Sequence, residues 1–178
     1  MPVLAGVLRQ FPFQIRGFHS DNGSEFINHN VAGMLNKLLI EQTKSRPRRC
    51  NDNGLVETKN GAVLRKHMGF GHIASEEAEL IDSFYEEHFN PYLNFHRPCG
   101  VPELRTDGRG KTRRISRWYA TPWEVLRQLP GLAGYLKPDL TVDELERRAG
   151  THTDTGAAIL MQEAKWKLFA GFEHRKTA

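Results

Sequence analysis

The hydrophobic positions in the first part of the chain switch repeatedly between helical and strand spacing. Residues 3–10 have the pattern of a helix end, and residues 14–19 alternate in the manner of a strand. After Asn28, a good N-cap, apolar residues recur at the spacing of an amphipathic helix: Val31, Met34, Leu35, Leu38 and Leu39. Residues 40–43 predict a second short strand, and residues 55–67 predict a further helix. This order of elements indicates an α/β fold.

The second half of the chain is predicted to be mainly helical. A third helix should begin at Ser75, because serine is a common N-cap and acidic residues fill the following turn. Pro91 is expected to break or kink this helix, since proline has no backbone N–H. The segment His96-Arg97-Pro98 is expected to terminate it. Residues 101–120 are rich in glycine, proline and arginine, which predicts a basic linker.

Helix signals are strong beyond this linker. Thr121-Pro-Trp-Glu124 has the pattern of a capping box with proline at the first helical position. Thr141-Val-Asp-Glu144 is a second capping box, with Leu140 and Leu145 placed as a hydrophobic staple. Residues 157–170 predict a last amphipathic helix.

The composition is that of a soluble globular protein, with 39% hydrophobic and 26% charged residues. No apolar run approaches the roughly 18 residues that a transmembrane helix needs. The first residues lack the basic region and cleavage site of a signal peptide. The two cysteines, Cys50 and Cys99, form no Cys-x-x-Cys pair and favour a reducing compartment without a zinc site. We therefore expect a cytoplasmic protein, associated with the nucleoid if bacterial, and no membrane partner.

Charge is distributed unevenly along the chain. The formal net charge is +4, acidic residues concentrate between 76 and 87, and basic residues cluster at 44–49 and 105–117. A polyanion-binding face opposite an acidic, solvated helix would produce this segregation. The second cluster is followed by Trp118 and Tyr119. It could contact phosphates and stack a base, or it could be a basic linker whose aromatic residues enter the next helix's core.

Two acidic residues stand where a divalent cation could bind. Asp21 follows a predicted strand, and Asn22-Gly23 permit a sharp turn that leaves its carboxylate exposed. Glu57 lies in the first turn of a predicted helix. A strand-end Asp and a helix-start Glu can converge on one hard cation. Each also has an ordinary structural explanation, as a turn aspartate or as a complement to the helix dipole.

These acids lie in strings that resemble the D,D-35-E superfamily of integrases and insertion-sequence transposases. Asp21 and Glu57 are separated by 35 residues, the spacing between the second and third acids of that superfamily. The segments that look like its bacterial insertion-element branch are HSDNGSEF, NDNGLVETKNG, residues 44–49 and residues 90–98. The resemblance covers residues 1–100 well and residues 101–125 more loosely.

The resemblance implies a fold and a chemistry. Residues 1–100 would be the C-terminal part of a ribonuclease-H-like integrase core, a mixed sheet with flanking helices, and residues 121–178 a mainly helical C-terminal region. The family cuts and joins DNA by transesterification with Mg²⁺ or Mn²⁺, which Asp21 and Glu57 would bind. The implied partners are element-end and target DNA, engaged by a homo-oligomer or with a full-length transposase. The DNA-contact candidates are Lys44, Arg46, Arg48, Arg49, Asn60, Arg65, Lys111, Arg113 and Arg114.

The sequence departs from the family's pattern in two places. The first catalytic Asp belongs upstream, yet residues 1–20 contain no Asp or Glu, and neither Glu25 nor Asp52 matches its position. Gly61 and Leu64 stand where the family often has basic residues one and two turns after the catalytic Glu. From the first departure we expect an N-terminally truncated core that is inactive alone. Its unpaired sheet edge would promote self-association.

Three other functions are compatible with these residues. The chain could be a non-catalytic DNA-binding or interfering transposase remnant, which needs only the basic clusters and the C-terminal helices. It could be a different nuclease on the same fold, although the 35-residue spacing argues against that. It could also be a decayed reading frame. Among single residues, His19 is interpreted as a buried, hydrogen-bonded histidine, Cys50 lacks a partner base for nucleophilic chemistry, and Trp123 and Trp166 are interpreted as core residues.

Overall fold

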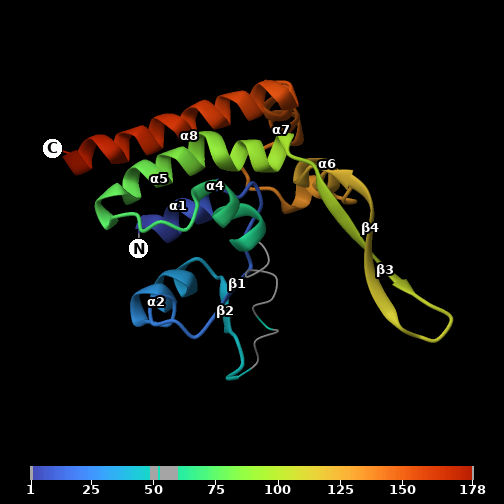
Figure 1. Ribbon diagram of the computed structural model, residues 1–178. Helices are drawn as coiled ribbons and strands as arrows, with labels where there is room; N and C mark the ends of the chain where they lie inside the picture. Colours follow the sequence, from blue (N-terminus) through green and yellow to red (C-terminus); the bar gives the residue numbers. More distant parts are fainter. Residues whose placement is uncertain (1, 49–51, 53–59, 178) are drawn as a thin grey trace. The chain divides into compact units, whose positions relative to one another are not determined.

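The computed structural model describes residues 2–48, residue 52 and residues 60–177 (Figure 1). The chain divides into two compact units, Met1–Ala74 and Ser75–Ala178. The strands of the described residues form two two-stranded sheets, one in each unit, and helices make up most of the remaining regular structure. This confirms the predicted α/β class. The segment 1–100, which the resemblance assigns to one core, spans the division between the units.

The first unit contains a parallel strand–helix–strand motif. Helix α1 (Pro2–Gln10) precedes strand β1 (Gly17–Ser20), and helix α2 (His29–Lys37) connects β1 to strand β2 (Glu41–Lys44). The two strands pair in parallel, from Gly17 opposite Glu41 to Ser20 opposite Lys44. A helical crossover is the usual connection between parallel neighbours. The predicted helices at 3–10 and after Asn28, and the predicted strands, are thus confirmed with slightly different ends.

A small apolar core holds this motif together. Val31 and Leu35 of α2 and Ile40, just before β2, are almost fully buried. Five less buried residues, from α1, β1, the segment between them and α2 itself, pack around these three: Leu4, Leu8, Ile15, Phe18 and Met34. The predicted N-cap is confirmed, because Asn28 Oδ1 accepts a hydrogen bond from the Val31 N–H at 3.0 Å. The cap and the core together fix where the helix begins and which face it buries.

The last helix of the first unit is described from Asn60 onwards. A π-helical turn (η2, Asn60–Arg65) leads into helix α4 (Lys66–Met68), and Gly69 ends it with φ +77°. Only glycine adopts such an angle without strain, so it is a common helix terminator. The predicted helix over residues 55–67 agrees with this from residue 60, and residues 55–59 lie outside the described residues.

The second unit opens with a long helical segment that runs through Pro91. A 3₁₀ turn (η3, Ser75–Glu77) is followed by α5 (Ala78–Phe84) and two π-helical turns, η4 (Tyr85–Phe89) and η5 (Tyr92–His96). Pro91 itself has helical angles, φ −56° and ψ −47°. Of the two predicted outcomes, the break at Pro91 is therefore wrong, and the kink stays a prediction. The π-helical turns on both sides use wider hydrogen bonds, which accommodate a residue without an N–H.

The start and the end of this segment differ in how well they were predicted. Ser75 was expected to cap the helix, but its hydroxyl donates to Glu76 Oε1 at 3.1 Å and begins a 3₁₀ turn instead. The residue directly before α5 is Glu77, the last residue of this 3₁₀ turn, and it makes no side-chain cap hydrogen bond. The end is confirmed, because the helical segment stops at His96, whose side chain is buried.

A β-hairpin occupies the segment predicted as a linker. Strand β3 (Cys99–Thr106) pairs antiparallel with strand β4 (Thr112–Ala120), and the register shifts at a bulge between Val101 and Pro102. A bulge tolerates proline because the ladder is interrupted there. At the turn, Asp107 Oδ1 accepts hydrogen bonds from the backbone N–H groups of Arg109 and Lys111, both at 3.0 Å. This turn chemistry makes the segment a hairpin rather than an unstructured linker.

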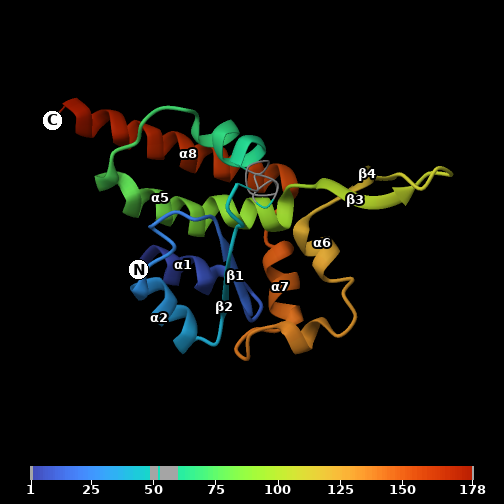
Figure 2. The same ribbon diagram turned by 90° about the horizontal axis from the view of Figure 1, so that it is seen from below.

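The remaining helices build the core of the second unit. They are α6 (Pro122–Leu126), the 3₁₀ turn η6 (Leu132–Tyr135), α7 (Val142–Ala149) and α8 (Asp154–Thr177), which runs alongside α5 (Figures 1 and 2). Trp123, Leu132, Leu136 and Leu145 form one buried cluster, and α8 buries Ala157, Met161, Leu168 and Phe172. The capping box at Thr121 is complete. At Thr141 only half of it forms, because the Glu144 carboxylate accepts from Arg147 and Arg148 instead.

The two tryptophans interpreted as core residues have different environments. Trp123 is 4% exposed and lies in the main cluster, which confirms the prediction. Trp166, on α8, is 64% exposed, so its assignment to the core was wrong. The helix is apolar on several sides, and a hydrophobic pattern alone did not identify which side packs. Within the described part of the chain, no helix combines the length and apolarity that a bilayer span requires.

Candidate metal and nucleic-acid site

The carboxyl ends of the parallel strands β1 and β2 bring two distant segments together. The Ser45 N–H donates to the Ser20 carbonyl at 2.9 Å, which extends the strand pairing by one residue. The Asn22 side-chain amide then donates to the Ser45 carbonyl at 3.1 Å. Because parallel strands end at the same edge, Asp21 and the basic segment after β2 lie next to one another. Side chains at such an edge are placed to bind ligands.

Asp21 lies at this edge with its carboxylate exposed to solvent. Its Oδ1 accepts a hydrogen bond from the Gly23 N–H at 3.0 Å, which closes a tight turn within the motif. A Cβ at Gly23 would lie 2.5 Å from a carboxylate oxygen of Glu25, so the flexible Glu25 side chain would have to move for a larger residue to fit. The second carboxylate oxygen of Asp21 has no hydrogen-bond partner in the part of the chain that the structure describes. The prediction of an exposed strand-end carboxylate is confirmed.

A hydrogen-bonded network connects the ends of β1 and β2 at this edge. His19 Nδ1 lies 2.8 Å from Thr43 Oγ1, and His19 Nε2 lies 3.3 Å from Ser45 Oγ. The Ser45 hydroxyl is also 3.3 Å from the Ser20 carbonyl oxygen. The imidazole thereby joins the two strands at their ends. His19 was predicted to be buried and hydrogen-bonded; the hydrogen bonding is confirmed, but the residue is exposed because β1 lies at the surface there.

Arg46 and Asp52 form an ion pair next to the strand ends. The Arg46 guanidinium donates from Nε to Asp52 Oδ2 at 3.0 Å and from an Nη to Oδ1 at 2.8 Å, and the Arg46 backbone N–H donates to Oδ2 at 3.0 Å. These hydrogen bonds from Arg46 lower the pKa of Asp52 to about 2. Arg46, a predicted DNA contact, is thus already neutralised by an acid of its own chain.

The other predicted contacts in the first unit are exposed. Lys44 and Arg48 have solvent-exposed side chains, as do Asn60 and Arg65. The Arg65 guanidinium lies 5.6 Å from the centre of the Phe70 ring, a cation–π contact. Arg49 and the second predicted metal ligand, Glu57, lie outside the described residues. The structure therefore brings Asp21 close to the 44–46 segment, and the position of Glu57 stays a prediction.

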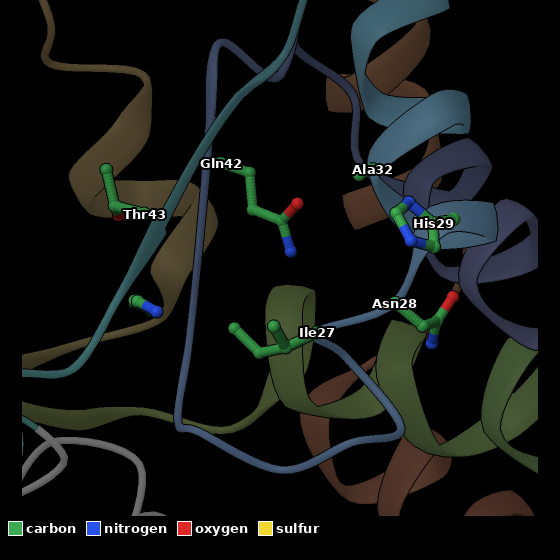
Figure 3. Close-up of a pocket in the computed structure, with 7 residues that line it drawn as sticks. Ile27, Asn28, His29, Ala32, Gln42 and Thr43 are labelled. Carbon is green, nitrogen blue, oxygen red and sulfur yellow. The ribbon is translucent and has the colours of Figure 1, made fainter.

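An open hollow lies beside β2 and the start of α2 (Figure 3). Gln42 points into it from β2, and the Gln42 amide donates to the Phe26 carbonyl at 3.0 Å. Its other lining residues are Ile27, Asn28, His29, Ala32, Thr43 and Lys44. Asp21 is not part of this lining, so the hollow is separate from the candidate metal ligand.

The predicted contacts in the second unit lie on the β3–β4 hairpin. Lys111 follows the turn directly, and Arg113 and Arg114 are successive residues of β4. All three side chains are exposed. Arg105, which the sequence did not single out from its cluster, lies directly opposite Arg113 in β3. Arg109, at the turn, is a further cationic residue of this hairpin.

At the strand ends, Asp21 could supply one ligand to a hard cation. It does not form a whole metal site by itself. Asp21 offers a free carboxylate oxygen, which Mg²⁺ and Mn²⁺ favour. Within the described ranges, no group of three or more His, Cys, Asp and Glu side chains could hold a metal ion. Magnesium often takes only one or two carboxylates from the protein and completes its shell with water and substrate phosphate oxygens. Among the described residues, the Asp21 carboxylate is therefore the part of a cation site that the geometry supplies.

The sequence predicted the charged residues of this edge. It did not predict the polar residues that hold the strand ends beside Asp21. Asn22, Thr43 and Ser45 form the hydrogen bonds that align the two strand ends. Thr43 and Ser45 alone carry no recognisable motif. A signal existed for Asn22, which lies inside the string HSDNGSEF, but its partner across the sheet depends on the strand register.

Comparisons with known proteins give little further information on function. No family model and no solved structure matches the chain. Among curated proteins, it is similar to the uncharacterized protein y4rM of Sinorhizobium fredii (strain NBRC 101917 / NGR234), with 41% identity over 109 residues. The match covers 61% of this chain and 31% of y4rM, so the matched part of the chain spans about a third of that relative's length.

Proposed function

We propose that the chain is part of an integrase-like DNA transposase, in which Asp21 and Glu57 are two ligands of Mg²⁺ or Mn²⁺. The observation that carries this proposal is the position of Asp21. It follows β1 directly, at the edge where two parallel strands end, with one carboxylate oxygen free. The 35-residue spacing to Glu57 and the surrounding motif strings supply the rest of the support.

The architecture of the first unit supports a ribonuclease-H-like origin. Its β1–α2–β2 motif is a parallel crossover, the kind of unit from which the later part of such a sheet is built. The basic segment after β2 lies next to Asp21, where the phosphates of a bound DNA would approach the metal.

The chemistry follows from the ligand type. When bound, a pair of divalent cations activates a hydroxyl nucleophile and stabilises the leaving oxygen at a phosphodiester. The chain's own residues position the cation and the DNA: Asp21 supplies a carboxylate oxygen, and His19, Thr43 and Ser45 hold the strand ends in register. The 178 residues contain two of the motif's three acids, so we expect no cleavage by them unless a further carboxylate is supplied.

The proposal is tested by the linkage between metal and DNA binding. Mn²⁺ should tighten binding of the chain to a short duplex at constant ionic strength, because the phosphate and the two acids share the cation. Asp21→Asn and Glu57→Gln should each abolish this tightening, whereas Asp139→Asn, an exposed acid in the second unit, should retain it. A DNA affinity that Mn²⁺ leaves unchanged would contradict the proposal. Metal-dependent nicking that is lost in Asp21→Asn would contradict only the expected inactivity.

A second candidate function is a DNA-binding remnant without catalysis. It is favoured by the exposed cations of the β3–β4 hairpin, which need no metal to bind phosphates. In that case, DNA binding would depend on salt but not on Mn²⁺, Asp21 or Glu57. The same titrations therefore distinguish the two functions.

A further inference from the structure

The β3–β4 hairpin is a two-stranded ribbon without a third strand. Among the described residues, neither strand pairs with any other, so both outer edges are open. Figure 1 shows the ribbon extending away from helices α5 to α8 of its own unit. The shorter strand, β3, has eight residues and spans about 27 Å at ~3.4 Å per residue. An isolated hairpin is only marginally stable in water, so its projection from the helices calls for a partner.

The outer part of this hairpin carries cations on both of its faces. Residues directly opposite one another in an antiparallel pair share a face, and successive residues alternate. Arg105 lies opposite Arg113 on one face, and Arg114 lies opposite Leu104 on the other. On that second face Thr106 and Thr112 hydrogen-bond through their hydroxyls at 3.0 Å. The ribbon therefore presents positive charge in two opposite directions.

These arginines have no acidic partner among the residues that the structure describes. Described ion pairs engage Arg46, Arg127, Arg147 and Arg148, but none involves Arg105, Arg113 or Arg114. Like charges directly opposite on a hairpin destabilise it. Arg105 and Arg113 therefore repel one another, and Glu103, two residues before Arg105 on the same face, forms no described ion pair with either. A partner that supplies negative charge would relieve this repulsion.

We propose that the outer half of the β3–β4 hairpin enters the major groove of duplex DNA, with Arg105 and Arg113 on the phosphates of one strand and Arg114 on those of the other. The major groove is about 12 Å wide and admits a two-stranded ribbon. A groove places phosphates on both sides of the ribbon, which matches cations on both faces. Duplex RNA does not fit, because its major groove is deep and narrow.

This inference rests on the DNA partner of the proposed function but not on its metal site. The test therefore uses the full chain in EDTA and measures its affinity for a short DNA duplex across a range of salt concentrations. The double variant Arg105→Gln/Arg113→Gln should bind at least about tenfold more weakly, and its salt slope should fall by about 2, one for each lost phosphate contact. Arg114→Gln alone should lower the slope by about 1.

The matched control is Arg147→Gln/Arg148→Gln, which removes the same charge from exposed arginines that Glu144 already engages. It should leave the affinity within about twofold of the parent chain. Equal losses in the control and in the hairpin variant would overturn the proposal, as would an Arg114→Gln variant that binds normally. Binding to duplex RNA of the same sequence as tight as to DNA would also overturn it. Thermal unfolding, followed by tryptophan fluorescence, verifies that each variant folds.

Loss of Mn²⁺ linkage with intact hairpin dependence would refute the metal site and leave this inference standing. If the hairpin variants bound DNA normally while Mn²⁺ still tightened DNA binding, this inference would be refuted and the metal site would stand. The two proposals therefore fail separately.

Discussion

The two strand pairs of this protein place their polar residues in opposite ways. In the first unit, parallel strands β1 and β2 are joined by a helix, and their ends collect polar side chains far apart in sequence into one network. In the second unit, antiparallel strands β3 and β4 are joined by a short turn and expose a row of cations along a ribbon. The first arrangement concentrates ligands at a point, and the second spreads charge over a length.

The difference also separates the two basic clusters. Arg46, beside the parallel strands, is neutralised by Asp52, so part of that cluster stabilises its own loop. Arg105, Arg113 and Arg114, on the hairpin, have no such partner among the described residues. A run of basic residues in a sequence therefore does not show which of its charges are available to DNA. Their availability depends on the acids that the fold brings alongside.

The largest expected effect comes from weakening the core beneath the parallel strands. Leu35 is 0% exposed, and Leu35→Ala should lower the free energy of unfolding of the first unit by about 2–5 kcal/mol. All three tryptophans, Trp118, Trp123 and Trp166, lie in the second unit. Tryptophan fluorescence should therefore follow an unchanged denaturant transition, while circular dichroism detects an earlier one.

The matched variant in the other unit is Leu145→Ala, whose side chain is 1% exposed. It should move the fluorescence transition by a similar amount. If Leu35→Ala moved both transitions together, the two units would unfold as one, and the contrast between them would not extend to stability.

A smaller effect is expected at the hairpin turn. Gly110 has φ +77°, a left-handed angle that costs a residue with a Cβ about 1–2 kcal/mol. Gly110→Ala should therefore increase amide hydrogen exchange in β3 and β4 and weaken DNA binding in EDTA without changing the first unit. Gly108→Ala is the control, because a Cβ there meets nothing within 4 Å and its φ is not left-handed. Equal exchange in both variants would show that the turn does not hold the ribbon.

Local signals predicted the elements of this fold well. The cap at Asn28 and the capping box at Thr121 depend on residues within one turn, and both form as expected. The strand end at Asp21 was likewise readable, because turn residues follow it directly. Local signals gave wrong predictions at two positions, the helix start at Ser75 and the helix break at Pro91. Ser75 bonds the adjacent Glu76, and Pro91 is accommodated by π-helical turns rather than ending its helix.

Contacts between residues far apart in the chain could not be predicted from the sequence alone. The partners of His19 depend on the register of β1 against β2, and the pairing of Arg46 with Asp52 depends on how the intervening loop closes. The hairpin was missed because its strands are basic and glycine-rich rather than alternating in hydrophobicity. Arg105 and Arg113 become a recognisable pair only once the register sets them opposite one another.

The smallest expected effect tests whether the Arg46–Asp52 pair withholds a cation from DNA. Asp52→Asn removes the acid that engages Arg46, so Arg46 becomes free to contact a phosphate. We expect DNA binding about threefold tighter, with a salt slope steeper by about 1. Asp139→Asn changes the net charge equally but frees no arginine, so it should leave the slope unchanged. An unaltered slope in Asp52→Asn would place Arg46 away from DNA.

The pH dependence of the same pair gives an independent measurement. The pKa of Asp52 is lowered from an ordinary value of 3.8 to about 2, so the ion pair stabilises the fold above the ordinary value and is lost as the pH falls through about 2. Carboxyl chemical shifts should report this titration directly, and Arg46→Gln should return it toward the ordinary value. A normal titration in the parent chain would mean that Arg46 is as available as the hairpin arginines, and the contrast between the two basic clusters would disappear.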